Sequence, residues 1–240
     1  MATGNLLIDN LAAPVRARVV AAATPIALKI RDSIYAAGQP VDFAYFPIDG
    51  FISNVVTMHD GEAVEVGVIG REGMAGINLT LFGATSATTL YTQIAGDALR
   101  VPRDEMLEII AGMEPPSLFA AYVEAQFGSL AQYAACNRLH TIDQRFARWL
   151  LMAHDRVAGD EIRLTQEFLA LMLGVRRPGV TVAAAALQRA GLIANRRGRI
   201  VLSDRTGVEA AACECYRAVE NRFGDLLGYS ISKSSPFARV

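Results

Sequence analysis

LTQEFLALMLGVRRPGVTVAAAALQRAGLI, residues 164–193, carries the pattern that decides the fold of the C-terminal half. Its first apolar residues recur three and four apart, which predicts one buried helical face with Thr165 as the N-cap. Gly174 ends this helix, because glycine adopts the left-handed conformation without a Cβ clash. Pro178 fits the first position of a second helix, which extends to Gly191. Two helices joined by a tight turn are therefore predicted.

Basic charge follows the same stretch. Between Phe168 and Ser203 there is no Asp or Glu, whereas six arginines occur: Arg176, Arg177, Arg189, Arg196, Arg197 and Arg199. A helix, a glycine turn, a second helix that opens with arginines and a basic hairpin follow the order of a winged helix-turn-helix. In that motif the second helix enters the major groove of DNA and the wing contacts phosphates. The alternative is a three-helix packing unit with a solvated basic face, which leaves the long acid-free run unexplained.

The stretch resembles the DNA-binding domain of the Crp–Fnr superfamily of bacterial transcription regulators. The residues that carry the resemblance are the Thr165 opening, Ala170, Gly174-Val175, Arg177, Val180, Leu187 and Gly191-Leu192-Ile193. On this resemblance and on the basic charge, the expected DNA-binding residues are Thr165, Arg176, Arg177, Thr181, Arg197 and Arg199. The further partners it implies are a second copy of the chain, a palindromic duplex site and RNA polymerase.

Arg177 falls where the family places a guanine-reading arginine, whose forked guanidinium can hold O6 and N7 of guanine together. Two neighbouring positions depart from the family pattern. Pro178 and Val182 stand where cyclic-AMP-type regulators carry a Glu and a second reading arginine. The DNA half-site is therefore expected to differ from theirs.

The whole chain has 240 residues, of which 52% are hydrophobic, and a net charge of −1. This composition allows a full core, and we see no apolar run of membrane-span length and no N-terminal leader, so we expect a soluble cytoplasmic protein. Residues 1–139 carry 8 basic and 14 acidic side chains, and residues 140–240 carry 15 and 10. That asymmetry suits a sensing half joined to a nucleic-acid-binding half.

Three cysteines and three histidines are too few and too dispersed to suggest a disulfide framework or a metal centre. Cys213 and Cys215 are two apart, which is not the usual metal-ligand spacing, and no histidine lies near them in sequence. We therefore expect buried or incidental thiols, no metal and no cofactor. A nucleophile–base constellation is also not recognisable, so no catalytic residue is assigned.

The N-terminal half alternates short β-branched segments with turn signals, which predicts a sandwich or barrel. The expected strands are 27–31, 44–47, 52–58, 63–69, 89–95 and 97–101. This half resembles the jelly-roll cyclic-nucleotide-binding domain that stands first in Crp–Fnr proteins. The segment Gly70–Gly76 occupies the place of the ligand cassette in that family.

The resemblance makes five residues the expected effector-binding set: Gly70, Arg71, Glu72, Ser86 and Ala87. Cyclic-nucleotide binders place a phosphate-neutralising arginine just before the Ser-Ala step, and this chain has Thr85 there. Because a buried phosphate needs a cation, cyclic AMP is not expected as the effector. The alternative for the cassette is a tight turn with only a structural role, which we favour slightly.

A long helix is predicted after Pro115-Pro116, and the family resemblance makes it a dimerisation helix. Its expected seam, spaced alternately four and three, is Phe119, Val123, Gln126, Leu130 and Tyr133. A helix packed only on its own barrel is the alternative. After the wing, a single helix is expected from Arg205 to Phe223, followed by a frayed tail from Ser230.

The predicted fold is α+β, in three parts: a sensor of antiparallel jelly-roll type at 1–115, a dimerisation and linker helix at 116–139, and a winged helix-turn-helix at 140–240. The leading function is a homodimeric, sequence-specific transcription regulator. Two alternatives stay open. One is a small-molecule-sensing protein that acts through protein partners. The other is a cupin-like metalloenzyme, against which the single barrel histidine, His59, argues.

Overall fold

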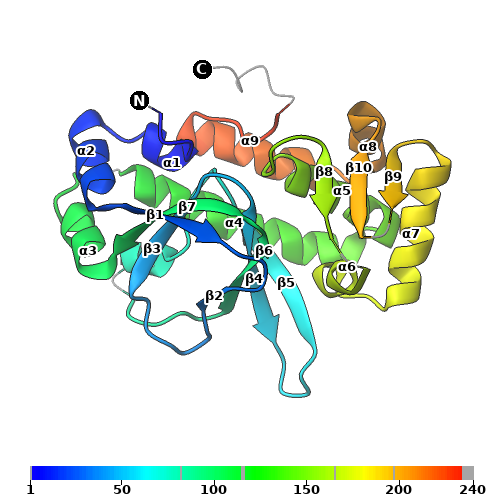
Figure 1. Cartoon of the computed structure of the whole chain (residues 1–240), viewed down its shortest axis with the longest axis horizontal. Helices are drawn as coiled ribbons and strands as arrows, with labels where there is room; N and C mark the ends of the chain where they lie inside the picture. Colours follow the sequence, from blue (N-terminus) through cyan, green and yellow to red (C-terminus); the bar gives the residue numbers. More distant parts are fainter. Residues whose placement is uncertain (1, 82, 115–116, 165, 197, 234–240) are drawn as a thin grey trace.

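The computed structural model describes residues 2–81, 83–114, 117–164, 166–196 and 198–233. It shows a β-rich N-terminal part, a long helix that runs behind it, and a C-terminal part of helices with a small sheet (Figure 1). The predicted α+β class and the order of the three parts are confirmed. In the described residues, no helix is long and apolar enough to cross a membrane.

In the described residues, the N-terminal part contains seven antiparallel strands, in two sheets ordered β1-β7-β3 and β2-β6-β4-β5. The strands are β1 (Thr24–Leu28), β2 (Ser33–Tyr35), β3 (Phe43–Pro47), β4 (Phe51–Thr57), β5 (Ala63–Ile69), β6 (Thr89–Ile94) and β7 (Gly96–Pro102). The arrangement is jelly-roll-like, as predicted, although the two sheets do not close into a barrel in the described residues.

The first strand lies three residues earlier than predicted. β1 ends at Leu28, and the amide of Asp32 donates to the carbonyl of Lys29 at 2.9 Å, so a turn occupies the predicted end of the strand. Arg31 in this turn has a φ of 71°, which is incompatible with an extended chain. The β-branched segment around Ile34 then forms β2, a short strand that the alternation did not single out.

The helical elements described beside these sheets are α1 (Leu6–Asp9), α2 (Ala13–Ala22), the 3-10 helix η1 (Ile77–Leu81) and α3 (Arg103–Ala111). Asn5 caps α1 by accepting from the Ile8 amide at 3.1 Å. The side-chain amide of Asn5 also donates to the carbonyl oxygens of Pro47 (2.8 Å) and Gly73 (2.9 Å). One buried asparagine thus joins the N-terminus, β3 and the 70–76 turn.

The long helix α4 (Leu118–Leu139) begins at Ser117, whose hydroxyl accepts from the Ala120 amide at 3.2 Å. The side chains of α4 that pack inside the protomer are Phe119, Tyr122, Ala125, Ser129, Tyr133 and Cys136. Phe119 and Tyr133, two members of the expected dimer seam, therefore face the core of their own protomer. The remaining three, Val123, Gln126 and Leu130, are partly or fully exposed.

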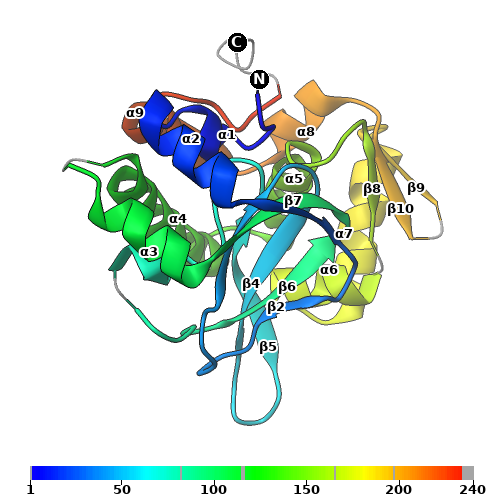
Figure 2. The same ribbon diagram turned by 60° about the vertical axis from the view of Figure 1, so that its left-hand side comes forward.

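The C-terminal part contains α5 (Ile142–His154), α6 (Gln166–Leu173), α7 (Arg177–Arg189), α8 (Arg205–Ala211) and α9 (Cys215–Leu227). Its sheet has the order β8-β10-β9, with β8 (Glu161–Arg163), β9 (Ile193–Arg196) and β10 (Arg199–Leu202), and stands beside α7 in Figure 2. Gly174, between α6 and α7, has a φ of 58°, as the turn requires. The winged helix-turn-helix is thus present as predicted.

The chain after the wing differs from the prediction. A break at Ala212–Glu214 separates α8 from α9 where one continuous helix was expected. Ser230 and Ser232 are buried instead of frayed, because the carboxylate of Glu220 accepts from the Ser230 hydroxyl and from the Ser232 amide (3.0 Å). Helix α9 packs along α4, so the last described helix lies against the long helix.

Candidate DNA interface and sensor cavity

Helix α7 presents one apolar and one polar face. Val180, Ala183, Ala184 and Leu187 are buried against α5 and α6. Pro178 occupies the second helical position, one later than predicted, because α7 already begins at Arg177. In Figure 1 this helix forms the outer edge of the molecule.

The first turns of α7 expose residues expected to contact DNA. Arg177 and Thr181 lie on the exposed face, one turn apart, and the Thr181 hydroxyl donates to the Arg177 carbonyl at 3.1 Å. Val182 is 65% exposed on the same helix. An arginine fork, a hydroxyl and a methyl-bearing side chain are therefore accessible together at the start of the helix, the part that reads base edges in this motif.

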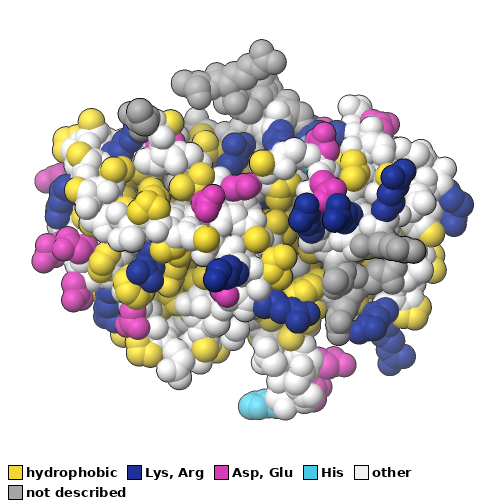
Figure 3. Space-filling model, in the orientation of Figure 1, with side chains coloured by type: hydrophobic (Ala, Val, Ile, Leu, Met, Phe, Trp, Pro, Cys, Tyr) yellow, Lys and Arg dark blue, Asp and Glu magenta, His cyan; other side chains and the backbone are white. Residues whose placement is uncertain are grey.

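The other predicted DNA-binding residues surround this turn. Arg199 lies on β10 with an exposed side chain, 3.7 Å from the carboxylate of Glu161 on β8. Arg176 is exposed at the N-cap of α7. Thr165 and Arg197 lie outside the described residues, so their predicted roles stay predictions. Figure 3 shows basic side chains gathered over the half of the molecule that holds the winged helix-turn-helix.

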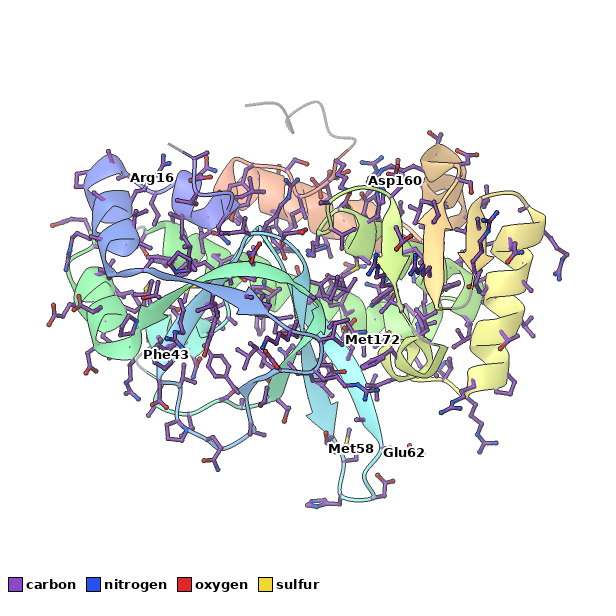
Figure 4. All side chains as sticks on the ribbon, in the orientation of Figure 1. Arg16, Phe43, Met58, Glu62, Asp160 and Met172 are labelled. Atoms are coloured by element: carbon purple, nitrogen blue, oxygen red, sulfur yellow. The ribbon has the colours of Figure 1, made fainter. Side chains whose placement is uncertain are left out.

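A groove of about 780 Å³ separates the β4–β5 hairpin from α6 and the turn before α7. Met58 and Glu62, labelled on the hairpin in Figure 4, form one wall, and Phe168 and Arg176 belong to the other. The guanidinium of Arg31 lies 5.1 Å from the centre of the Phe168 ring. The C-terminal part therefore rests directly on the N-terminal sheets.

A smaller cavity, of about 190 Å³, lies between the sensor sheet and α4. Its walls are Asn54, Gly67, Val68, Ile69, Met74, Ile77, Leu81, Tyr122, Val123, Gln126, Phe127 and Leu130. Among these described residues there is no Lys, Arg or His. The cavity is thus apolar with a few neutral polar groups, a lining suited to an uncharged ligand.

None of the five predicted effector residues is among those lining this cavity. Glu72 is fully buried and forms an ion pair with Arg156, which lies two residues after the end of α5 and whose Nη2 is 2.8 Å from Oε1. Gly70 donates its amide to the same oxygen at 3.0 Å. A Cβ at Gly70 would lie 2.6 Å from Cδ of Arg156, so only glycine allows this approach. The structural alternative for the cassette fits these contacts.

The other three predicted effector residues point elsewhere. Arg71 directs a guanidinium nitrogen to the Ile231 carbonyl, at 3.5 Å, in the C-terminal segment. Ser86 donates its hydroxyl to the Thr88 carbonyl at 2.7 Å, and Ala87 is exposed. The structure therefore does not bring the five residues together around one ligand site. The role of Arg156 was not predicted from the sequence, because Arg156 lies 84 residues from Glu72, its partner in the ion pair.

A second buried carboxylate joins the sensor to the DNA-binding part. Glu65 of β5 accepts from Trp149 Nε1 of α5 at 2.9 Å and from the hydroxyl of Ser53. Burial raises the pKa of Glu65 to about 7, although both hydrogen bonds and the charges of Arg148 and Arg156 oppose the shift. The sequence signal that could have identified Glu65 is an acidic residue on the inward face of an otherwise apolar strand.

We predict that Glu65 makes stability fall as the pH rises. Because its folded-state pKa lies above the ordinary value near 4.5, the folded protein binds this proton more tightly than the unfolded chain. The contribution is full below pH 4.5 and is lost as the pH passes through 7, on the order of 3 kcal/mol in all. Denaturant unfolding of the native protein and of Glu65→Gln at several pH values measures this difference. A pH-independent difference would contradict the prediction.

The cysteines are also arranged differently from the prediction. All three thiols are buried, but they are not scattered in space: Cys136, Cys213 and Cys215 meet at the end of α4 together with His140. No histidine lies near Cys213 and Cys215 in the sequence, but His140 lies beside them in the fold. The break between α8 and α9 brings these residues together.

The family comparisons agree with this architecture. Residues 25–112 match the cyclic nucleotide-binding domain, and residues 144–211 match the Crp-like helix-turn-helix domain. The comparison with curated proteins found no match.

Solved structures of similar fold share little sequence. A CRP-family transcriptional regulator from Thermus thermophilus is 22% identical, with a TM-score of 0.62 over 78% of this chain and 96% of that one. FixK2 from Bradyrhizobium japonicum is 20% identical, with a TM-score of 0.63 over 80% and 98%. The c-di-GMP-responsive global regulator CLP of Xanthomonas campestris is 19% identical, with a TM-score of 0.60 over 80% and 99%.

Two domains of distinct type therefore occur in one chain, in the order and with the linking helix that the structure shows, and the exposed face of α7 is available to DNA. This chain belongs to the Crp–Fnr superfamily of DNA-binding transcription regulators.

Proposed function

We propose that the protein binds a palindromic DNA site as a homodimer and reads each half-site with the first turn of α7. The observation that carries this proposal is the exposed arginine pair at the start of α7, inside a stretch without acidic residues. The parts would be a sensor at 1–115, a linker helix at 116–139 and a DNA-binding domain at 140–240. Acting on chromosomal DNA, the protein would work in the cytoplasm, with RNA polymerase as a further partner and no reaction of its own.

The dimer seam that we propose lies on the exposed face of α4. Ala120, Val123, Phe127, Leu130 and Ala134 are spaced alternately three and four apart, the spacing of a two-stranded coiled coil. Phe127 is 70% exposed and Leu130 is 38% exposed, which is unfavourable for a lone helix in water. Of the seam expected from sequence, Val123 and Leu130 remain, and Gln126 lies beside them.

We propose further that the sensor does not take cyclic nucleotides. A cyclic phosphate keeps its negative charge, and the described walls of the cavity offer no cation to pair with it. Titration calorimetry with cyclic AMP and cyclic GMP should therefore show no binding at micromolar concentrations. Saturable binding of either, lost in Arg71→Ala, would mean that Arg71 moves from Ile231 to the phosphate.

The test of base reading is Arg177→Ala. Sites selected from random duplexes define the operator, and the variant should bind that operator about 1–3 kcal/mol more weakly than the native protein. Affinity for unrelated DNA should change little, because a bidentate contact to guanine is not made there. Fluorescence anisotropy with both duplexes measures the two changes.

Arg199→Ala is the matched control, because it removes an exposed arginine from the wing instead of the helix. Because Arg199 is proposed to contact a phosphate, its replacement should weaken binding to both duplexes similarly and reduce the dependence of affinity on salt. Equal losses on both duplexes for Arg177→Ala would show that this residue does not read a base. If the native protein selects no site from the random duplexes, the proposed function itself is wrong.

A further inference from the structure

Four side chains with metal-binding atoms converge at the end of the linker helix. Cys136 lies in the last turns of α4, and His140 is the C-cap of that helix. Cys213 belongs to the α8–α9 connection, and Cys215 is the first residue of α9. Their three sulfur atoms and one imidazole nitrogen all lie within 4.8 Å of one another. Two segments more than 70 residues apart in sequence therefore supply one compact group of ligand atoms.

The separations suit a single tetrahedral ion. The two sulfurs of Cys136 and Cys213 are 3.5 Å apart, and Cys215 Sγ is 3.5 Å from His140 Nδ1. With Zn–S bonds of about 2.3 Å and Zn–N bonds of about 2.0–2.1 Å, ligand atoms at the corners of a tetrahedron stand roughly 3.5–3.8 Å apart. An iron–sulfur cluster divides its protein ligands between two or more irons, so it needs a wider opening.

The surroundings hold these ligands in place. His140 turns Nδ1 toward the thiols while Nε2 lies 3.1 Å from the carboxylate of Glu214. A carboxylate on the second ring nitrogen orients a metal-binding histidine and makes it a stronger ligand. Gln132 donates its amide to Cys215 Sγ at 3.0 Å, as expected of an acceptor that carries thiolate charge in the metal-bound state.

Access and burial are also suitable. The thiols of Cys136 and Cys215 are fully buried and Cys213 is 4% exposed, whereas the side chain of His140 retains 16% of its surface. The site is therefore shielded from solvent on the sulfur side and open at the histidine. We propose that Cys136, His140, Cys213 and Cys215 bind one Zn²⁺ ion, as a Cys₃His site that ties the end of α4 to the start of α9.

A disulfide between Cys136 and Cys213 is the simpler use of two neighbouring thiols. A disulfide would give no role to the contact between Cys215 and His140, or to the carboxylate of Glu214 beside the imidazole ring. Zinc uses all four groups, and it would fix the joint at His140, where the linker helix passes into α5 of the DNA-binding domain. Metal binding would thus set the orientation of that domain relative to α4.

The experiment titrates the reduced, metal-free full-length protein with Co²⁺ under anaerobic conditions, since tetrahedral Co²⁺ reports its ligands by absorption. We expect one Co²⁺ per chain, with intense visible bands of a tetrahedral ion and ultraviolet thiolate-to-metal charge transfer, and displacement by Zn²⁺. Cys136→Ser and Cys215→Ser should each abolish this spectrum. His59→Ala, which removes an exposed histidine on the β4–β5 hairpin, should leave it unchanged.

Glu214→Gln keeps all four ligands and should weaken Co²⁺ binding by about tenfold. This variant guards against the case in which a cysteine variant fails to fold, which circular dichroism would show. Weak octahedral absorption, a spectrum retained in both serine variants, or a Cys136–Cys213 disulfide that resists reduction and prevents metal binding would each overturn the proposal. Because the measurement needs no DNA, its outcome is independent of the proposed regulatory function.

Discussion

Replacement of Arg156 by methionine is expected to lower the free energy of unfolding by about 3–5 kcal/mol. The side chains of Arg156 and Glu72 are 4% and 0% exposed, and two guanidinium nitrogens contact Glu72 Oε1, at 2.8 and 3.0 Å. Without the arginine, the carboxylate stays in a site closed to water and has no counterion. The cost of leaving a buried charge unpaired exceeds what the pair itself contributes to stability.

The position of the Arg156–Glu72 pair gives the loss of Arg156 a second effect besides lower stability. Glu72 lies in the 70–76 turn of the sensor, and Tyr229 of the C-terminal segment donates its hydroxyl to the Glu72 carbonyl at 2.6 Å. Arg156 also donates to the Met152 carbonyl at 2.8 Å, which closes the end of α5. Losing the arginine should therefore loosen the contact between the sensor and the DNA-binding domain as well as lower stability.

Arg163→Met is the matched control, because Arg163 forms an ion pair with Glu161 at 2.9 Å but is 68% exposed. Exposed pairs of this kind contribute about 0–1 kcal/mol. Adding Glu72→Gln to Arg156→Met should recover part of the loss, since no unpaired charge then remains. Urea denaturation measures all three variants. Similar small losses for the two arginines would show that water reaches Glu72 in the folded protein.

The local patterns of the sequence were sufficient to predict the elements that carry DNA binding. The acid-free arginine stretch, the left-handed Gly174 and the proline at the start of α7 act within a few residues of one another, and the structure confirms the helix-turn-helix. The strands of the sensor were found for the same reason, because alternation is a local signal. There were two exceptions: β1 lies three residues earlier than expected, because a turn at Arg31 ends the extended segment, and the short strand β2 was not predicted.

Contacts between distant segments could not be derived in this way. Glu72 with Arg156, and Glu65 with Trp149, are each joined across 84 residues, and nothing near either acid indicates its partner. The four proposed metal ligands could not be grouped from the sequence for the same reason, since the two segments that supply them become neighbours only when α9 packs along α4. In α4 the apolar residues surround the helix, so sequence spacing alone did not separate the buried stripe from the exposed one.

The exposed stripe of α4 leads to the prediction with the largest effect on DNA binding. Phe127→Glu with Leu130→Glu should give monomers, because the four new carboxylates would face one another across the proposed two-fold seam. Both side chains are exposed in the protomer, so the fold should tolerate charges there. Sedimentation velocity measures the oligomeric state.

Loss of the dimer removes the second, tethered contact with a palindrome, which is worth roughly 10²–10⁴-fold in affinity. The double variant should therefore lose that factor on the palindrome and bind an isolated half-site as the native protein does. Val20→Glu with Ile30→Glu adds the same charges at exposed apolar positions outside α4, and should change neither sedimentation nor DNA affinity. A Phe127→Glu, Leu130→Glu protein that still sediments as a dimer would place the two-fold interface somewhere other than this face of α4.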